Sequence, residues 1–250
     1  MKKNLVFCVL IFFSDFSASA QSAKITENIN QLWFAYINQL RFSDKWELTT
    51  DLNLRTLDHF VDDLSVSIIR FGITYYVAPN TKLTAGYAWA NYFPADNHQY
   101  ISQTEHRPWQ QIQWNTKYRR KTMRQGIRLE ERFRRKILND STVEKGYNFN
   151  YRIRYAFLYE LPLGKKENVP GAISFIIADD IMINFGEQIV NNYFDQNRFY
   201  AGFKFQTGKD TNFQLAYMNI FKQLPTGNIY SNNNGIRLNC VQNLDLRHKK

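Results

Sequence analysis

Apolar and polar residues alternate with a period of two along most of this chain, and segment 46–55 shows the pattern most clearly. There Trp46 and Leu52 fall on one face, whereas Asp51 and Arg55 fall on the other. This period is typical of a β-strand whose two faces meet different surroundings. The pattern therefore predicts strands rather than amphipathic helices.

The alternation continues without a break through segment 147–161, where tyrosine and phenylalanine dominate one face and asparagine and arginine the other. Fifteen extended residues at ~3.3 Å each span about 50 Å, which is longer than typical strands of soluble proteins. Aromatic residues near strand ends are typical of a barrel at a lipid interface. We therefore predict lipid-facing apolar faces, a polar lumen and a closed barrel, because an open edge in hydrocarbon leaves backbone groups unpaired.

Eleven candidate strands follow from this pattern, near residues 31–40, 46–55, 65–77, 82–93, 104–117, 126–137, 147–161, 171–183, 197–206, 211–221 and 234–246. Short connections (41–45, 78–81, 207–210) alternate with long ones (56–64, 94–103, 184–196, 222–233). Short turns face the periplasm in bacterial barrels, which also have an even number of strands. We therefore predict an all-β fold, a closed antiparallel transmembrane β-barrel of about twelve strands, the twelfth within residues 24–30. The alternative is ten strands.

The first twenty residues are typical of a cleaved signal peptide. Lys2 and Lys3 precede an apolar run at 5–13, and Ala18-Ser19-Ala20 offers a cleavage site before Gln21. The apolar run is much shorter than the ~20 residues of a membrane-spanning helix. The sequence thus predicts two regions, a signal peptide at 1–20 and one barrel domain at 21–250.

Composition agrees with an exported barrel and excludes several kinds of chemistry. Aromatic residues make up 16% of the chain, and Cys240 is the only cysteine after residue 20, so no internal disulfide is expected. A glycine-rich phosphate loop, Cys-x-x-Cys and His-Glu-x-x-His are all missing, so we expect no cofactor and no metal. The chain is basic, with formal charge +10. Its run 118–124 is expected near anionic lipid headgroups, and we expect no nucleic-acid partner.

Four short strings occur in order along the chain: Glu-His-Arg-Pro-Trp-Gln-Gln at 105–111, Arg-Leu-Glu-Glu-Arg at 128–132, Tyr-Arg-Ile-Arg-Tyr at 151–155 and Phe-Asp-Gln-Asn-Arg at 194–198. Together with the signal peptide, the mature chain resembles an uncharacterised family of bacterial outer-membrane barrels, catalogued as a domain of unknown function. The resemblance implies a barrel in the Gram-negative outer membrane, surrounded by lipid and lipopolysaccharide, and implies no activity. The C-terminus departs from such barrels because it lacks a terminal aromatic residue.

Charged side chains gather on the polar faces of the central strands. The predicted lumen charge belt consists of Glu105, Arg107, Trp109, Gln111, Arg128, Glu130, Arg132, Arg152, Arg154 and Arg198. Arginine suits this position because its planar guanidinium pairs bidentately with a carboxylate. The favoured interpretation is a structural barrel braced by ion pairs. A passive, porin-like pore for small anionic solutes is the second interpretation.

An outer-membrane enzyme is the alternative from another class, with lipid, lipopolysaccharide or peptide as substrate. Its weak candidates are Asp96, His98, Asp62 and Asp63, which lie in two long loops at the predicted external rim. An acidic pair facing an Asp–His pair could activate water there. Aspartate is also common in turns for structural reasons, so we favour that interpretation and assign no catalytic residue.

Overall fold

The chain consists of β-strands joined by turns and loops. The computed structural model describes residues 24–27, 29–57, 60, 62–94, 98–225 and 227–247. Its strands are β1 (Lys24–Glu27), β2 (Asn30–Arg41), β3 (Trp46–Thr56), β4 (Leu64–Ala78), β5 (Thr81–Tyr92), β6 (Gln103–Tyr118), β7 (Lys121–Asn139), β8 (Thr142–Leu163), β9 (Ile173–Phe185), β10 (Phe194–Gln206), β11 (Thr211–Gln223) and β12 (Ile229–Asp245). Within these residues, no helix is long and apolar enough to cross a membrane. The predicted signal peptide and its cleavage site lie outside the described residues.

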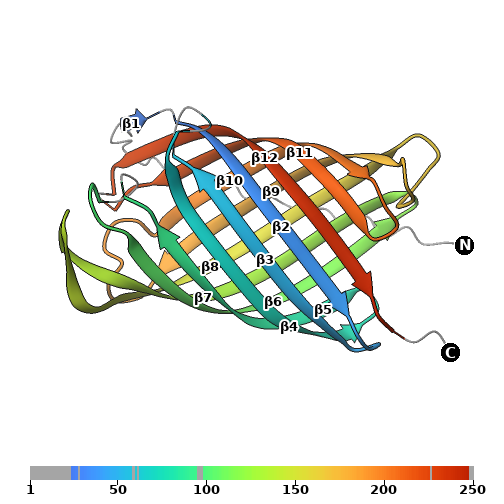
Figure 1. The fold of residues 1–250 in the computed structure, drawn as a ribbon, viewed down its shortest axis with the longest axis horizontal. Coiled ribbons are helices and arrows are strands. Elements are labelled where there is room, and N and C mark those ends of the chain that lie inside the picture. The colour runs from blue at the N-terminus through green and yellow to red at the C-terminus, as the bar shows by residue number, and fades with distance from the viewer. Residues whose placement is uncertain are drawn as a thin grey trace, which may run out of the picture.

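Strands β2 to β12 form a closed barrel (Figure 1). Each strand pairs with its neighbours in sequence in antiparallel fashion, and β12 closes the barrel by pairing with β2. This last pairing is parallel, with Asn234 opposite Asn30 and Asp245 opposite Arg41. The closing sheet therefore contains eleven strands, and the predicted counts of twelve and ten are both wrong. An odd number closes because β2 and β12 run in the same direction, so a parallel seam replaces an all-antiparallel one.

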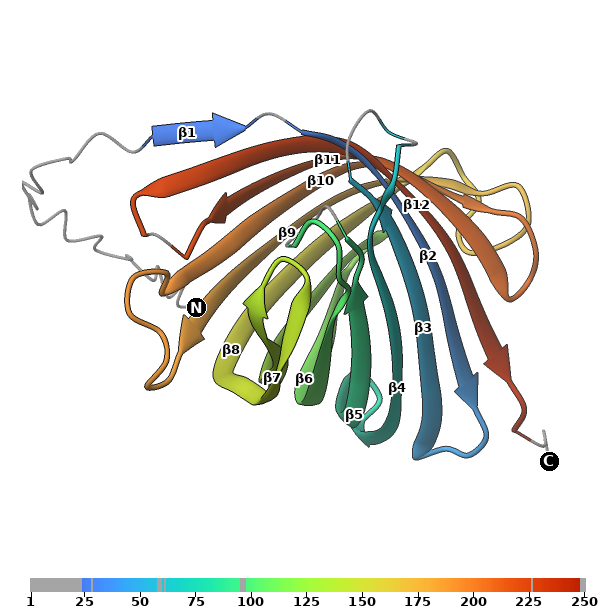
Figure 2. The same ribbon diagram turned by 60° about the vertical axis from the view of Figure 1, so that its left-hand side comes forward.

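A short strand does exist within residues 24–30, but it is not a twelfth strand of the closed barrel. Strand β1 pairs in parallel with the first residues of β12, Lys24 lying opposite Ile229. It therefore precedes β2 along the same edge of β12, as Figure 2 shows. All eleven strands predicted from alternation are confirmed, each within a few residues of its observed bounds.

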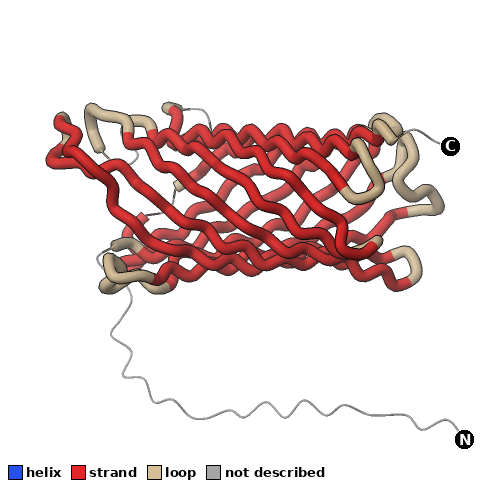
Figure 3. Tube along the Cα trace, turned by 90° about the horizontal axis from the view of Figure 1, so that it is seen from below, coloured by secondary structure: helices blue, strands red, loops and turns tan. Residues whose placement is uncertain are grey.

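The two ends of the barrel differ. Short connections 42–45, 79–80, 119–120 and 207–210, together with the loop 164–172 and the end of β12, define the turn end. The other connections and the start of β2 define the loop end. Strands β7 and β8 are the longest and pair almost to their tip, Asn139 opposite Thr142. Their hairpin extends past its neighbours at the loop end (Figures 1 and 3).

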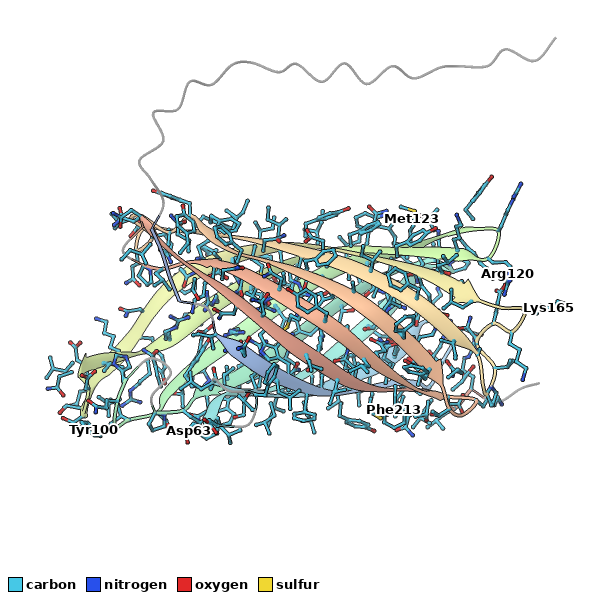
Figure 4. The ribbon with its side chains drawn as sticks, turned by 90° about the horizontal axis from the view of Figure 1, so that it is seen from above. Asp63, Tyr100, Arg120, Met123, Lys165 and Phe213 are labelled. Atoms are coloured by element: carbon cyan, nitrogen blue, oxygen red, sulfur yellow. The ribbon has the colours of Figure 1, made fainter. Side chains whose placement is uncertain are left out.

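The barrel has a polar inside and an apolar outside. On β3, Leu52 and Leu54 are exposed, whereas Glu47 is only 3% exposed. Phe213 likewise points outward in Figure 4. Among the described residues, buried polar and charged side chains outnumber buried hydrophobic ones. A soluble domain shows the reverse, so this distribution suits an apolar medium around the barrel and a hydrated or ion-paired lumen.

Aromatic side chains gather on the outer face near both ends. Towards the loop end, Phe133 lies 4.7 Å from Phe149, and Tyr151 stacks 5.3 Å from Phe185, all measured between ring centroids. At the turn end, Trp46 and Tyr75 form an edge-on pair at 4.9 Å. Such rings suit an interface between hydrocarbon and headgroups, because one part of each ring is apolar and, in Tyr and Trp, another is polar.

Two small hydrophobic clusters lie on the lumen wall and fix its bulkiest side chains. One contains Trp109 with residues of β4 and β5, and the other contains Trp33 with Tyr200 and Met218. The indole of Trp109 lies against Gly86 and Gly72: a Cβ at Gly86 would lie 2.6 Å from its Cζ2 atom, and one at Gly72 would lie 3.0 Å from it. Glycine is needed there because any side chain would displace the indole.

Candidate functional site

The residues predicted as a lumen charge belt all lie on the lumen side of β6, β7, β8 and β10. Seven are buried: Glu105, Arg107, Trp109, Glu130, Arg132, Arg152 and Arg198. The other three, Gln111, Arg128 and Arg154, line a cavity in the lumen. The alternation rule predicts this placement, since each strand points every second side chain inward. Their functional role stays a prediction.

Glu105 is the most enclosed carboxylate in this group, with an exposure of 0%. Arg132 binds it through two bonds, Nε to Oε1 at 2.7 Å and Nη2 to Oε2 at 3.1 Å. Arg134 donates to Oε2 from 2.9 Å, and Arg107 donates to Oε1. Three guanidinium groups therefore converge on one carboxylate, so their positive charge exceeds what Glu105 alone can neutralise.

Arg152 joins two further carboxylates. Its Nε donates to Oε2 of Glu130 at 2.9 Å, and its Nη1 donates to Oδ2 of Asp195 at 2.8 Å. Asp195 also lies 4.0 Å from Nη1 of Arg132 and accepts from Asn184 at 3.2 Å. These contacts of Arg152 and Asp195 connect β7, β8, β9 and β10 to the Glu105 group. We call the connected set the ion-pair belt: Glu105, Arg107, Glu130, Arg132, Arg134, Arg152 and Asp195.

Sequence reasoning missed Asp195 because residue 195 was placed in the long connection 184–196, whereas β10 begins at Phe194 and carries a β-bulge at its start. The register between β9 and β10 shifts between Phe194 and Gln196. Asp195 and Gln196 are consecutive, and both are buried, at 8% and 9% exposure. Strict alternation allows only one of two neighbours to face the lumen, and a bulge relaxes that rule. The Asp195 carboxylate was present in the string 194–198, but alternation alone did not assign it to the lumen.

Arg128 and Arg154 belong to a second group, closer to the turn end than the ion-pair belt. Arg154 pairs with Asp180 at 2.7 Å, and Arg128 lies over the Trp109 ring, 4.4 Å from its centroid. Arg128 also approaches Glu130, at 3.7 Å, which links the two groups. The predicted single belt is thus two adjoining sets of charges.

Two cavities occupy the lumen, one on each side of a constriction. The loop-side chamber has a volume of about 1200 Å³ and is lined by the arginines of the ion-pair belt. The turn-side chamber has a volume of about 540 Å³. Three residues line both chambers: Trp33, Arg55 and Arg198. The guanidinium carbon atoms of Arg55 and Arg198 lie 3.6 Å and 5.0 Å from the Trp33 ring centroid, so the three side chains pack together where the chambers meet, and we call this boundary the constriction.

The turn-side chamber holds polar groups that sequence reasoning did not single out, among them Arg70, Tyr200 and Arg237. Six buried side-chain atoms in the described chain have no hydrogen-bond partner: Nε of Arg55, Arg70 and Arg154, Nη1 of Arg128, Nε1 of Trp109 and the Tyr200 hydroxyl. All six belong to residues that line this chamber. A buried donor left unsatisfied typically costs about 1–3 kcal/mol, so six such atoms around one chamber are energetically unfavourable together.

Comparison with protein families gives the chain a family and no activity. The family described as a protein of unknown function, DUF2490, matches residues 30–231. The chain belongs to this family. The match begins at the first residue of β2 and ends within β12, so it covers most of the barrel. No curated protein and no solved structure matches the chain.

Of the weak rim candidates of this family member, His98, Asp62 and Asp63 lie among the described residues, and no ion pair joins His98 to either of these two aspartates there. His98 pairs through Nδ1 with Asp140 of the β7–β8 hairpin, at 3.5 Å. Asp62 and Asp63 end the β3–β4 loop, where the Asp63 carbonyl accepts a bond from the Leu57 N–H at 2.9 Å. Asp96 lies outside the described residues. Within the described part of the chain, no three His, Cys, Asp or Glu residues are grouped to hold a metal ion.

At the turn end, the basic run 118–124 contacts the loop between β8 and β9. Arg120 donates to the Glu167 carboxylate, and Lys117 lies 3.8 Å from it. The Arg120 guanidinium holds the pKa of the Glu167 carboxyl below its usual range. Part of the basic run is thus held to the β8–β9 loop by charge pairing at this end of the barrel. Its expected contact with lipid headgroups stays a prediction.

Proposed function

We propose that this protein is an integral β-barrel of the bacterial outer membrane whose charged lumen braces the barrel and is closed to free diffusion. The observation that carries the membrane part is the apolar outer face above a polar, largely buried interior. Closure of the sheet supports it further, because every strand of the barrel has hydrogen-bonded neighbours on both sides. The aromatic rings near both ends suit the two interfaces of a bilayer.

The proposed orientation places the turn end in the periplasm and the loop end outside the cell. The signal-peptide features of residues 1–20 and the short connections at the turn end support it. Lipid and lipopolysaccharide are then the surroundings of the outer face. Nucleic acid is not a proposed partner, since the basic run 118–124 lies at a membrane-proximal turn.

The ion-pair belt and the constriction support the structural role. The belt ties β6, β7, β8 and β10 together by ion pairs on one side of the lumen. At the constriction, Arg55 and Arg198 both lie on the Trp33 ring, so their positions are set by packing as well as by charge. A solute passing from one chamber to the other would meet these three side chains at the boundary. Braced strands and a filled constriction together favour a closed barrel.

An anion-selective pore is the second candidate, and the arginines of the turn-side chamber favour it. Planar-bilayer recording of the purified mature protein separates the two. The closed barrel predicts no stepwise conductance for the parent protein, and brief openings only after Arg55→Ala or Arg198→Ala widens the constriction. Stable, anion-selective steps in the parent would instead establish the pore.

Membrane integration has its own test, independent of conductance. Carbonate extraction of the membrane fraction should leave the protein in the pellet, and unheated samples should migrate differently from boiled ones in a detergent gel. A protein that washes off with carbonate and runs alike in both lanes is not an outer-membrane barrel. Incubation with lipid, lipopolysaccharide and peptide addresses the enzyme alternative, which turnover abolished by His98→Ala would support.

A further inference from the structure

The turn-side chamber is strongly cationic. Eight arginines line it, namely Arg55, Arg70, Arg120, Arg124, Arg128, Arg154, Arg198 and Arg237, and the carboxylates on the same wall are Asp51, Glu160, Glu167 and Asp180. Lysines add to the excess, among them Lys117 and Lys209 near the turns. Among the described residues, no carboxylate lies within ion-pair distance of Arg55, Arg198 or Arg237. The wall therefore carries more positive charge than its own acids balance.

The unsatisfied donors of the barrel gather in the same place. Tyr200 and Trp109 are each only 5% exposed, yet neither the Tyr200 hydroxyl nor the Trp109 indole N–H has a partner among the described residues. Four arginine nitrogens on the same wall also lack a hydrogen-bond partner, and of these Nη1 of Arg128 lies 3.7 Å from the Glu130 carboxylate. Each of the five nitrogens is a donor only, and the Tyr200 hydroxyl also has a proton to donate. The side chains of Arg70, Arg128 and Arg154 are themselves 14–19% exposed, so their other nitrogens are the ones that the acceptor atoms of a ligand would contact.

The loop-side chamber provides an internal comparison. Its arginines include Arg132 and Arg152, which bind carboxylates at 2.7–2.9 Å through several nitrogens. None of the described buried atoms that lack a partner belongs to an arginine found only in that chamber. Burial in the lumen therefore does not by itself leave arginine donors unsatisfied. The turn-side chamber differs from its neighbour in having surplus charge and surplus donors at once.

We propose that the turn-side chamber is a binding site for a small, soluble molecule that carries two or more phosphate or carboxylate groups. Guanidinium groups suit such ligands because their planar forks bond two oxygens of an oxyanion at once. The volume of about 540 Å³ lies within the range of ordinary small-molecule sites. Lys117, Arg120 and Lys209 line the chamber near the turns, so the ligand enters from the turn end. The constriction lies at the opposite end of the chamber.

Isothermal titration of the folded mature barrel, in a neutral sugar-based detergent, tests this site with pyrophosphate in one arm and citrate in the other. The parent protein should bind at least one of the two with a stoichiometry near one, and the arm that binds distinguishes phosphate from carboxylate chemistry. Arg55→Gln and Arg237→Gln should each weaken binding about tenfold or more, since each removes a charged guanidinium group from the wall. Neither change strips a carboxylate of its partner, so both variants should fold, and Arg237→Lys should restore part of the affinity.

Arg135→Gln is the matched control. Its side chain lies outside both chambers on the β7–β8 hairpin and bonds only the Glu144 carbonyl, yet it makes the same change of charge. Binding should be unchanged in this variant. The site is refuted if the heat-modifiable, folded parent binds neither probe at millimolar concentration, or if Arg135→Gln weakens binding as much as Arg237→Gln. These readouts are made in detergent, so they stand apart from the tests of membrane integration and of conductance.

Discussion

Replacing Glu105 by glutamine is the most informative single perturbation of the ion-pair belt. Glutamine keeps the shape of the side chain but removes its charge, while Arg107, Arg132 and Arg134 remain around it. Two of these arginines cannot turn to solvent, since the side chains of Arg107 and Arg132 are only 7% and 5% exposed. Arg134 is 33% exposed and can relax. The variant therefore leaves at least two buried guanidinium groups short of a counter-charge.

Breaking a buried pair of this kind typically costs about 3–5 kcal/mol, whereas an exposed pair contributes about 0–1 kcal/mol. We expect Glu105→Gln to lower the free energy of unfolding by an amount in the first range. Glu167→Gln, at the turn end, is the matched control because it makes the same chemical change in an exposed pair. Urea titration of the reconstituted barrel, followed by tryptophan fluorescence and by gel mobility, measures both.

A double variant makes the electrostatic cause testable. Glu105→Gln combined with Arg132→Gln removes one of the stranded charges, so it should be more stable than Glu105→Gln alone. Equal unfolding midpoints for the parent and Glu105→Gln would show that lumen water screens these charges. A double variant that loses the sum of both single losses would show that packing, and not charge, holds this part of the barrel.

Three further outcomes are expected. Glu130→Ala should also destabilise the barrel by about 3–5 kcal/mol in the same urea titration, because it leaves Arg152 with Asp195 alone; an unchanged midpoint contradicts this. Gly86→Ala should cost about 1–3 kcal/mol, because the new methyl group would overlap a backbone oxygen; a neutral effect would mean that the strands can shift. The lowered pKa of Glu167 should rise towards its usual value in Arg120→Ala, in an NMR titration of labelled glutamate. The stabilising effect of this pair should be present above the ordinary carboxyl pKa and be lost as the pH falls through the lowered one.

Most of the barrel could be predicted from the sequence, because alternation reports directly on the two faces of each strand. Segment 46–55 shows this well: Asp51 and Arg55 were assigned to the polar face, and both line the turn-side chamber. Alternation carries no information on which two strands close the barrel. The strand count therefore rested on a general rule of even parity, and the parallel pairing of β2 with β12 departs from that rule.

The site was predicted only where it followed the same alternation. Arg128, Glu130 and Arg132 were correctly placed on one face, but the division of the lumen into two chambers depends on contacts across the barrel that a single strand does not reveal. Trp33 and Arg198 illustrate this, because they meet from β2 and β10 although neither segment marks the other as a neighbour. Asp195 was missed because the predicted strand began at residue 197, and the bulge at the start of β10 would have defeated strict alternation there as well.

Spin labels on β12 can show whether the barrel has an apolar medium outside and a polar lumen inside. Single cysteines at Ile236, Leu238 and Cys240 lie on the outer face, and those at Arg237 and Asn239 lie on the lumen face, where both native side chains line the turn-side chamber. The extra cysteines are introduced in a Cys240→Ala background, and the labelled proteins are reconstituted in bilayers. We expect outer-face labels to collide with oxygen dissolved in the lipid and lumen labels to collide with a water-soluble nickel chelate. The two responses should therefore alternate residue by residue along β12. Collision with the nickel chelate on both faces, or an alternation of opposite phase, would contradict this expectation.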